Sequence, residues 1–411
     1  MTIHEQNRQA LIEYFQGGCK GNDMGCVGVE MEHFILDEDG EQVHYDEPNG
    51  RLSIRGILEK LAEFWPDVTR TEAGDIMGCS RQLSAISIEP AGQIEVSLAP
   101  FSSIYDIKAE YENFYYRLRK VIEPAGYTIR TGGYNPTMKA EELELIPKPR
   151  YHFMNEYFAS LPGMHGERMM RATTSLQISL DYADEADAVR KMRIATLLGP
   201  IVSFVCDNCT VFEGELNDVP LRRLQVWRKV DPARCGVVPG LFDEGFGFGT
   251  YADWLLSVPP IFSTRDGEHA TGATPADEVY ADAPMTEEDV FHLLGMVWPD
   301  VRLKNYVEVR QADSLPEMPA LGYVSLIKGI YYGPLSLDMI EHKLGVDTKG
   351  WGQYSEQSVE DAIAAIAQDG FDALVYGRSV TEWIDFLFQL APAGLGSEVE
   401  YLDELRDFRG L

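Results

Sequence analysis

Two glutamates placed two residues apart, Glu30 and Glu32, are the side chains in this sequence whose type and spacing most directly suggest chemistry. They lie in the segment from Cys26 to Asp37, which is otherwise built largely of apolar residues. In an extended strand alternate side chains point to the same face, so the two carboxylates would share one face. A buried carboxylate needs a cation, hydrogen-bond donors or a metal, because losing its water is costly. For one such segment alone, an edge strand with a solvated face is an equal alternative.

Three further segments repeat this alternation of polar and apolar residues. Their polar positions are Gln93, Glu95 and Ser97, then Ser175, Gln177, Ser179 and Asp181, and finally Tyr306, Glu308 and Arg310. Another carboxylate stands just before the Pro-Ala-Gly break that precedes the first of these segments. If all four strands pair in one sheet, their polar faces would form a single surface. That surface would carry Glu30, Glu32, Glu89, Glu95, Gln177 and Glu308.

Such a surface predicts a site for a hard cation. Magnesium prefers oxygen ligands and is usually held by a few carboxylates together with substrate phosphates. Arg310 lies two residues from Glu308 on the same face, where its guanidinium could bind a phosphate oxygen. The residues therefore predict magnesium together with a nucleotide. Replacing Glu30 or Glu308 with Gln is expected to abolish turnover and to leave the fold largely intact.

Composition excludes several classes of function. The 411 residues include 35 basic and 66 acidic side chains, which gives a net charge of −31. Such a chain repels phosphate backbones and anionic lipids, so we expect neither a nucleic acid nor a membrane as partner. Six cysteines in a long chain without a secretory signal predict reduced thiols and a cytoplasmic location. The longest apolar run, from Ile194 to Cys206, is too short to span a bilayer.

Hydrophobic spacing predicts the elements that must position these residues. Helical spacing covers an opening segment up to Phe15 and the ranges 52–65, 104–122, 184–208 and 286–297, and several further helices follow residue 322. The polar stretch from Asp266 to Pro284 is expected to be a mobile loop or lid. No internal repeat or linker is found. We therefore expect one large domain, with a catalytic region over 1–335 and a helical C-terminal extension over 336–411.

Two cationic segments leave alternatives open. Lys148, Arg150 and Tyr151 form a compact cluster that is either a surface turn, which the sequence alone favours, or a contact to phosphate or nucleotide. The second segment is dense in arginine for so acidic a chain. Its members are Arg222, Arg223, Arg228 and Arg234. Because guanidinium groups bind carboxylates and phosphates bidentately, an anionic substrate could dock there.

Six motifs, in order from about residue 20 to residue 335, resemble the glutamate-cysteine ligase family of the plant and proteobacterial type. They are GVEMEHF, EPAGQIEVSLAP, PKPRYxxM, MMRATTSLQISLDY, VWxxxDPARCG and YVEVRQAD. The chain is similar also to actinobacterial enzymes that supply γ-glutamylcysteine for ergothioneine, and to carboxylate-amine ligases. The resemblance implies an α+β, glutamine-synthetase-like fold. In that fold a curved antiparallel sheet carries magnesium and ATP on its concave face, and helices pack on its convex face.

The resemblance also implies roles for single residues. Ligands to two or three magnesium ions would be Glu30, Glu32, Glu89, Glu95 and Glu308, with Gln177 as a further ligand or nucleotide contact. Arg310 resembles the arginine that steadies the transferred phosphoryl group, and Arg223 resembles one that binds glutamate. Weaker candidates for the substrate pocket are Arg171, Thr173 and Tyr251. Candidate nucleotide contacts are Lys148, Arg150 and Arg310.

The implied reaction is ATP-dependent amide formation between L-glutamate and L-cysteine. The γ-carboxylate of glutamate would be phosphorylated at a site containing Arg310 and Glu308, and the amino group of cysteine would then displace phosphate. The products would be γ-glutamylcysteine, ADP and phosphate. One alternative is a ligase of the same fold that uses another amine, and a second is a non-catalytic protein that binds metal or nucleotide. The sequence leaves the amine acceptor and the oligomeric state open.

Overall fold

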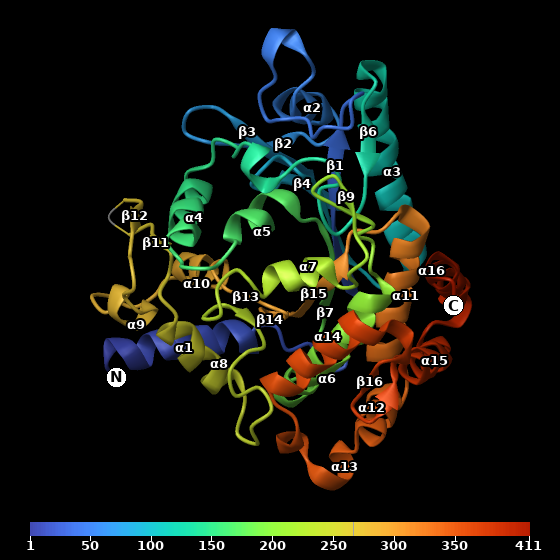
Figure 1. Ribbon diagram of the computed structural model, residues 1–411. Coiled ribbons are helices and arrows are strands. Elements are labelled where there is room, and N and C mark those ends of the chain that lie inside the picture. Colours follow the sequence, from blue (N-terminus) through green and yellow to red (C-terminus); the bar gives the residue numbers. More distant parts are fainter. Residues whose placement is uncertain (266) are drawn as a thin grey trace.

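A nine-stranded antiparallel sheet forms the centre of the protein (Figure 1). The structure is a computed structural model and describes residues 1–265 and 267–411. The strands are β1 (Val27–Leu36), β2 (Asp67–Arg70), β3 (Ile76–Arg81), β4 (Ser84–Ile88), β5 (Ile94–Phe101), β6 (Thr128–Arg130), β7 (Ser175–Leu180), β14 (Val301–Leu303) and β15 (Val307–Asp313). Their order is β14-β15-β7-β1-β5-β4-β3-β2, and β6 also pairs with β1.

The four strands with alternating polar residues are neighbours in this sheet, in the order β15-β7-β1-β5. The register places Glu30 opposite Gln177, and Glu32 opposite Glu95. Glu308 lies opposite a serine of β7. Because directly opposed residues share a face of the sheet, the polar positions of all four strands lie on one side. This confirms the single polar surface predicted from the sequence.

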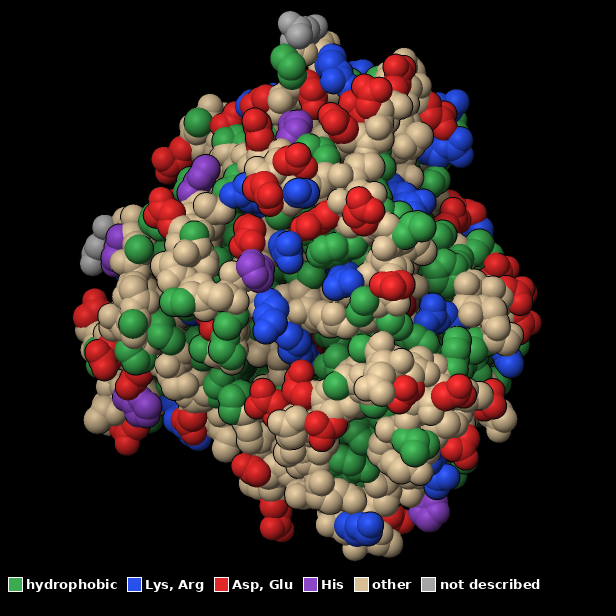
Figure 2. Space-filling model, in the orientation of Figure 1, with side chains coloured by type: hydrophobic (Ala, Val, Ile, Leu, Met, Phe, Trp, Pro, Cys, Tyr) green, Lys and Arg blue, Asp and Glu red, His purple; other side chains and the backbone are tan. Residues whose placement is uncertain are grey.

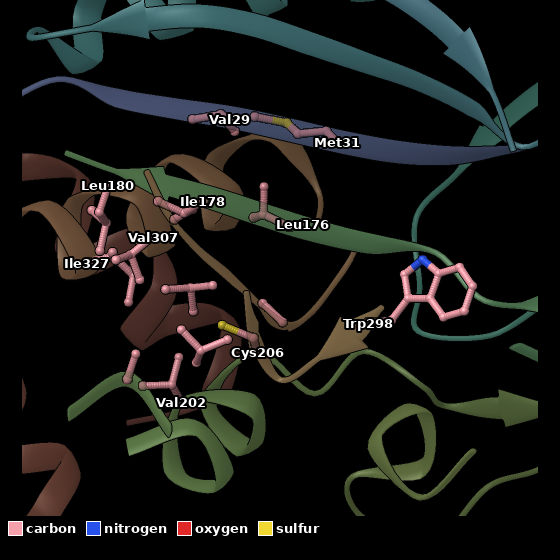
Figure 3. Close-up of a cluster of buried hydrophobic side chains, with 14 of the residues drawn as sticks. Val29, Met31, Leu176, Ile178, Leu180, Val202, Cys206, Trp298, Val307 and Ile327 are labelled. Carbon is pink, nitrogen blue, oxygen red and sulfur yellow. The ribbon is translucent and has the colours of Figure 1, made fainter. Parts of the chain in front are cut away.

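The other face of the same strands is apolar and packs against α6 (Glu185–Val205) and α11 (Glu317–Tyr332). Figure 3 shows Ile178 of β7 and Val307 of β15 beside side chains from these helices, among them Val202 and Ile327. All four side chains are buried. Burial of each such aliphatic side chain contributes roughly 1.5–3 kcal/mol to folding. This packing of helices on an antiparallel sheet confirms the predicted α+β class.

Several helices begin where the sequence provides a capping residue. The predicted helix at 104–122 is confirmed as α3 (Ile104–Ile122), and the opening helix is α1 (Ile3–Gln16). Ser53 caps α2 (Ile54–Leu61) by accepting a hydrogen bond from the backbone N–H of residue 56. Helix α10 (Glu287–Leu294) ends earlier than predicted, because Gly295 closes it and Trp298 enters a short strand.

Shorter helices surround the polar face of the sheet (Figure 1). They are α4 (Pro149–Ala159), α5 (Gly166–Ala172), α7 (Arg222–Trp227), α8 (Phe248–Ser257) and α9 (Ala276–Val279). The last of these lies in the segment expected to be a mobile loop or lid, which also contains β12 (His269–Ala270) paired with β11 (Phe262–Ser263). The rest of 267–284 is irregular, as expected, and α9 begins where acidic residues after a proline favour a helix start. The mobility of the segment stays a prediction. Asp266 lies outside the described residues.

The C-terminal helices share their core with the sheet-covering helices. They are α12 (Ser336–Leu344), α13 (Val346–Lys349), α14 (Glu356–Asp369), α15 (Val380–Leu390) and α16 (Leu402–Arg409). Helix α16 packs on α11, and α14 packs on α6. The division of the chain at residue 335 stays a prediction. Within residues 1–265 and 267–411, no helix has the length and apolar character that a bilayer crossing needs.

Candidate active site

The polar face of the sheet borders a cavity of about 340 Å³. Carboxylates from β1, β5 and the turn after β4 line one side, and the β14–β15 hairpin contributes Arg302, Lys304 and Arg310. Helices α4, α5, α7 and α10 complete the lining with Met154, Met169, Trp227 and Phe291 among other residues. We call this space the catalytic cavity. It brings together an acidic wall, a basic wall and an apolar wall.

Three carboxylates of the acidic wall have no cationic partner in the part of the chain that the structure describes. They are Glu30, Glu89 and Glu95, and each is half-buried. Burial, followed by repulsion from neighbouring carboxylates, raises the pKa of Glu30 and of Glu89 to about 7, and that of Glu95 to about 8. Glu95 accepts hydrogen bonds from the hydroxyls of Ser87, at 2.8 Å, and Ser97, at 3.2 Å. The wall therefore carries unbalanced negative charge when ionised.

Glu32 has a different environment, because β7 supplies donors to both of its carboxylate oxygens. The backbone N–H of Ser175 donates at 2.7 Å and its hydroxyl at 2.8 Å. The Nε2 of Gln177 donates at 3.1 Å. Burial raises the pKa of Glu32, while the charge of Arg223 and the bonds from Ser175 oppose that shift. Glu32 is thus held in place by the protein before any ligand binds.

Glu308 is fully buried beneath the basic wall and is surrounded by cations. Arg302 donates to it through Nε at 2.7 Å and Nη2 at 3.0 Å, Lys304 through Nζ at 2.9 Å and Arg310 through Nη1 at 2.8 Å. Burial alone would raise the pKa of Glu308, but these three cations hold it well below its usual range. It is not among the residues that line the catalytic cavity. In this structure Glu308 is the counter-ion of the basic wall, not an open ligand.

Two arginines share the face of one tryptophan at the edge of the catalytic cavity. The guanidinium carbon of Arg310 lies 5.7 Å from the ring centre of Trp227, and that of Arg223 lies 5.9 Å from it. Arg310 also donates to the side-chain oxygen of Gln177. Arg223 is 3% exposed, and its Nε has no hydrogen-bond partner among the described residues. A guanidinium that lines the catalytic cavity without a carboxylate partner in the described part of the chain suits an anionic ligand.

The sequence of the chain matches a known protein family. The model of glutamate-cysteine ligase family 2 matches residues 26–349.

The chain belongs to this family.

Chloroplastic glutamate-cysteine ligase of Brassica juncea is 33% identical over 317 residues, which are 75% of this chain and 60% of that protein. The Arabidopsis thaliana enzyme is 32% identical over 341 residues, 81% of this chain and 64% of that enzyme. The chain thus spans less than two thirds of the length of these relatives. A crystal structure of glutamate-cysteine ligase from Francisella tularensis in complex with AMP aligns with a TM-score of 0.51 at 11% identity, over 95% of this chain and 82% of that one. This likeness shows that the two chains share a fold.

Most residues expected from the family motifs lie at the catalytic cavity. The lining includes Glu30, Glu32, Glu89, Glu95, Gln177, Arg223, Arg310, Arg150 and Thr173. Thr173 uses its hydroxyl to donate to the backbone oxygen of Met169 at 2.7 Å. Arg150 donates to the backbone oxygen of Gly295 at 3.2 Å, so it ties α4 to the end of α10.

Three other expected residues do not line it. Lys148 stands just before α4, with Pro149 as the first helical residue, so the favoured surface turn is wrong. Its Nζ lies 5.0 Å from the ring centre of Tyr151, and burial lowers its pKa. Arg171 donates to the backbone of residue 143 and to the side-chain oxygen of Asn155. Tyr251 is fully buried and accepts from the backbone N–H of residue 303 at 3.2 Å. Lys148, Arg171 and Tyr251 are not among the residues that line the catalytic cavity.

The arginines of the arginine-dense segment have different environments. Only Arg223 of its four arginines lines the catalytic cavity. Arg228 binds both carboxylate oxygens of Asp300, at 2.7 and 2.6 Å, and Glu360 of α14 at 2.6 Å. Arg234 is fully buried and bridges Asp231, at 2.6 Å, to the backbone oxygen of residue 296 at 3.0 Å. Arg228 and Arg234 therefore position the loops around the cavity, and docking of an anion on them, as the sequence suggested, is wrong.

Sequence reasoning missed the cations that balance Glu308. Arg302 lies directly opposite Glu308 in the β14–β15 register, and Lys304 is in the turn between the strands. The signal was present, because Arg302 and Lys304 alternate with Leu303 as the residues of the next strand do. A hairpin with its turn at Asn305 brings Arg302, Lys304 and Glu308 close together.

The donor chemistry of the acidic wall fits a divalent cation. Among the described residues, no three His, Cys, Asp or Glu side chains converge closely enough to hold a metal ion as they stand. Glu30, Glu89 and Glu95 nevertheless lie near enough to other carboxylates to have raised pKa values, and nearby cations such as Lys304 and Arg150 offset this only in part. Carboxylate oxygens are the ligands that magnesium prefers.

The raised pKa values predict that stability falls as pH rises. At neutral pH the native protein keeps part of the protons on Glu30, Glu89 and Glu95 that the unfolded chain has released. The contribution of these three groups to stability is therefore fully present below the unfolded pKa of about 4.5 and is lost as the pH rises through 7 to 8. We expect the free energy of unfolding to drop by on the order of 2 kcal/mol between about pH 6 and 8.5 without divalent cations. Urea unfolding at a series of pH values measures this.

Two comparisons isolate the acidic wall in that experiment. Glu95→Gln should weaken the dependence of the free energy of unfolding on pH. Asp313, a buried carboxyl elsewhere with a pKa of about 7, is kept in that variant, so its contribution to the pH dependence stays. Millimolar magnesium at the alkaline end should restore stability, because a cation replaces the lost protons. A profile that Glu95→Gln leaves unaltered would contradict the assignment.

Proposed function

We propose that the chain is an ATP-dependent ligase that joins the γ-carboxylate of L-glutamate to the amino group of L-cysteine, releasing ADP and phosphate. The observation that carries this proposal is the catalytic cavity, where unpaired carboxylates face the arginine pair on Trp227. Membership of glutamate-cysteine ligase family 2 supports it. A cavity that offers carboxylates to a cation and guanidinium groups to anions suits phosphoryl transfer to a carboxylate.

Glu30, Glu89 and Glu95 would hold magnesium, with Glu32 fixed beside them. The cation held there would supply positive charge to offset the charge of the ATP phosphates. Arg310 would stabilise the charge on the transferred phosphoryl group from its position between Gln177 and Glu308. Arg223 lines the catalytic cavity, and its guanidinium would bind a carboxylate of glutamate.

The apolar wall would protect the activated intermediate. An acyl phosphate is hydrolysed by water, so the second step needs a site from which water is excluded. Met154, Met169 and Trp298 are buried and line the catalytic cavity. None of the cysteines that the structure describes lines it, and the proposed reaction requires no covalent bond to the protein. The incoming amine would meet the acyl phosphate inside this wall.

The test is ADP release by the purified chain with ATP and magnesium. We expect little release with glutamate alone, and strong release with glutamate plus cysteine, accompanied by γ-glutamylcysteine in the mass spectrum. Release only with another amine would keep the activation chemistry and change the acceptor. Absence of ADP release with glutamate and every amine offered would overturn the proposed function.

A further inference from the structure

A second cavity, of about 190 Å³, lies on the far side of α5 and α7 from the catalytic cavity. Its lining includes His165, Arg168, Phe212, Arg222, Gln225 and Lys229. We call it the outer cavity. Figure 2 shows Lys and Arg side chains gathered near the middle of the face where α5 and α7 lie in Figure 1. The proposed ligase reaction uses none of these residues.

Helical periodicity explains why two helices serve two cavities. On α7 and just after it, Arg222, Gln225 and Lys229 follow a spacing of three and four residues, which puts them on one face. Arg223 and Trp227 lie on the other face and line the catalytic cavity. Helix α5 is divided in the same way, with Arg168 outside and Met169 and Met170 inside. Each helix therefore separates the two cavities.

The outer cavity carries positive charge that the protein leaves unbalanced. Arg168 pairs with Glu213, at 3.2 Å, and the Nδ1 of His165 lies 3.3 Å from Glu167. Arg222 and Lys229 take part in no ion pair within residues 1–265 and 267–411. The Nε of Arg222 donates only to the neutral side chain of Asn217, at 2.9 Å. Two unpaired cations beside one hollow stand out in a chain of net charge −31.

An aromatic ring forms the apolar part of the same hollow. The guanidinium carbons of Arg222 and Arg168 lie 4.8 and 5.5 Å from the ring centre of Phe212. That ring also packs on Tyr134, with 4.3 Å between the ring centres. Phe212 is thus held rigidly with guanidinium groups over it. A ligand with a charged end and an apolar end could contact the cations with the first and Phe212 with the second.

We propose that the outer cavity binds a small organic anion, with its phosphate or carboxylate group at Arg222 and Lys229 and its apolar part against Phe212. The backbone N–H of His165 donates to the oxygen of Lys229 at 2.6 Å, so α5 and α7 are already joined at this point. The bound anion would lie in a hollow that Arg168 of α5 also lines, beside the two helices that carry Met169 and Arg223 into the catalytic cavity.

The experiment is calorimetric titration of the full chain with phenyl phosphate and, separately, with benzoate, in the absence of ATP and glutamate. We expect one saturable site for at least one of them, and the stronger binder identifies the head group. The double substitution Arg222→Gln and Lys229→Gln should weaken binding about tenfold or more, because it removes both charge-assisted contacts. Lys229→Gln alone should weaken it less. All variants are compared after circular dichroism has confirmed the fold.

Two controls locate the binding. Arg117→Gln removes a guanidinium that lies 4.1 Å from the ring centre of Phe64 and lines neither cavity, so it should leave binding unchanged. Arg310→Gln alters the catalytic cavity and should also leave it unchanged. The proposal is overturned by the absence of saturable binding, by binding that survives the double substitution, or by loss with Arg310→Gln. These outcomes are independent of whether the ligase reaction occurs.

Discussion

Replacement of Arg310 by Gln is expected to lower kcat of the proposed ligase by about a thousandfold or more, as for arginines that stabilise phosphoryl transfer elsewhere. The guanidinium lines the catalytic cavity and is positioned by Gln177 and Glu308, so it can meet charge that develops on the transferred group. The KM for glutamate should change much less, because Arg223 remains. Steady-state kinetics with ADP release as readout measures both quantities.

Arg310→Lys is the matched control for that substitution. Lysine keeps the positive charge beside Glu308 but cannot form the two directed bonds of a guanidinium, so activity should be recovered only in part. Both variants should fold, since Arg302 and Lys304 still neutralise Glu308. A kcat for Arg310→Gln within tenfold of the parent would refute a role in the transfer step.

Replacement of Glu308 by Gln is expected to lower the free energy of unfolding by about 3 kcal/mol or more. The change leaves Arg302, Lys304 and Arg310 without their shared counter-ion, which is fully buried. This revises the expectation from sequence that the variant keeps its fold and loses only its metal. Urea unfolding at neutral pH measures the effect.

Glu30→Gln provides the comparison for that result. Glu30 has no cationic partner among the described residues, and burial raises its pKa to about 7. Its neutral replacement should leave stability unchanged or raise it at alkaline pH, while turnover is lost. If Glu308→Gln proves as stable as Glu30→Gln, the buried charge cluster does not contribute to folding as described.

The strands and their common polar face could be predicted because a period of two residues is a local property. The alternation of Gln177 and Glu308 with aliphatic neighbours fixes which side chains share a face once the strands pair. Which carboxylates are paired with cations could not be predicted in this way. Glu308 and Glu95 have similar sequence contexts. In the sheet, however, Glu308 lies directly opposite Arg302, whereas Glu95 lies directly opposite Glu32.

The irregular connections were harder to predict for a related reason. Lys148 and Arg150 stand beside two prolines, which suggest a turn, but Pro149 occupies a position where a helix tolerates proline. Arg171 and Arg223 are similar side chains on short helices, and only the packing of α5 and α7 decides which one reaches the cavity. Such decisions depend on contacts between segments distant in sequence.

Arg228 joins the catalytic cavity to a part of the chain that the family resemblance does not cover. The family match ends at residue 349, whereas one of the two carboxylates that hold Arg228 is Glu360. Its other partner, Asp300, directly follows the strand that carries Trp298 into the cavity. The boundary of recognisable sequence is therefore not a boundary of cooperative folding, and a chain cut at residue 349 would lose support for its own cavity wall.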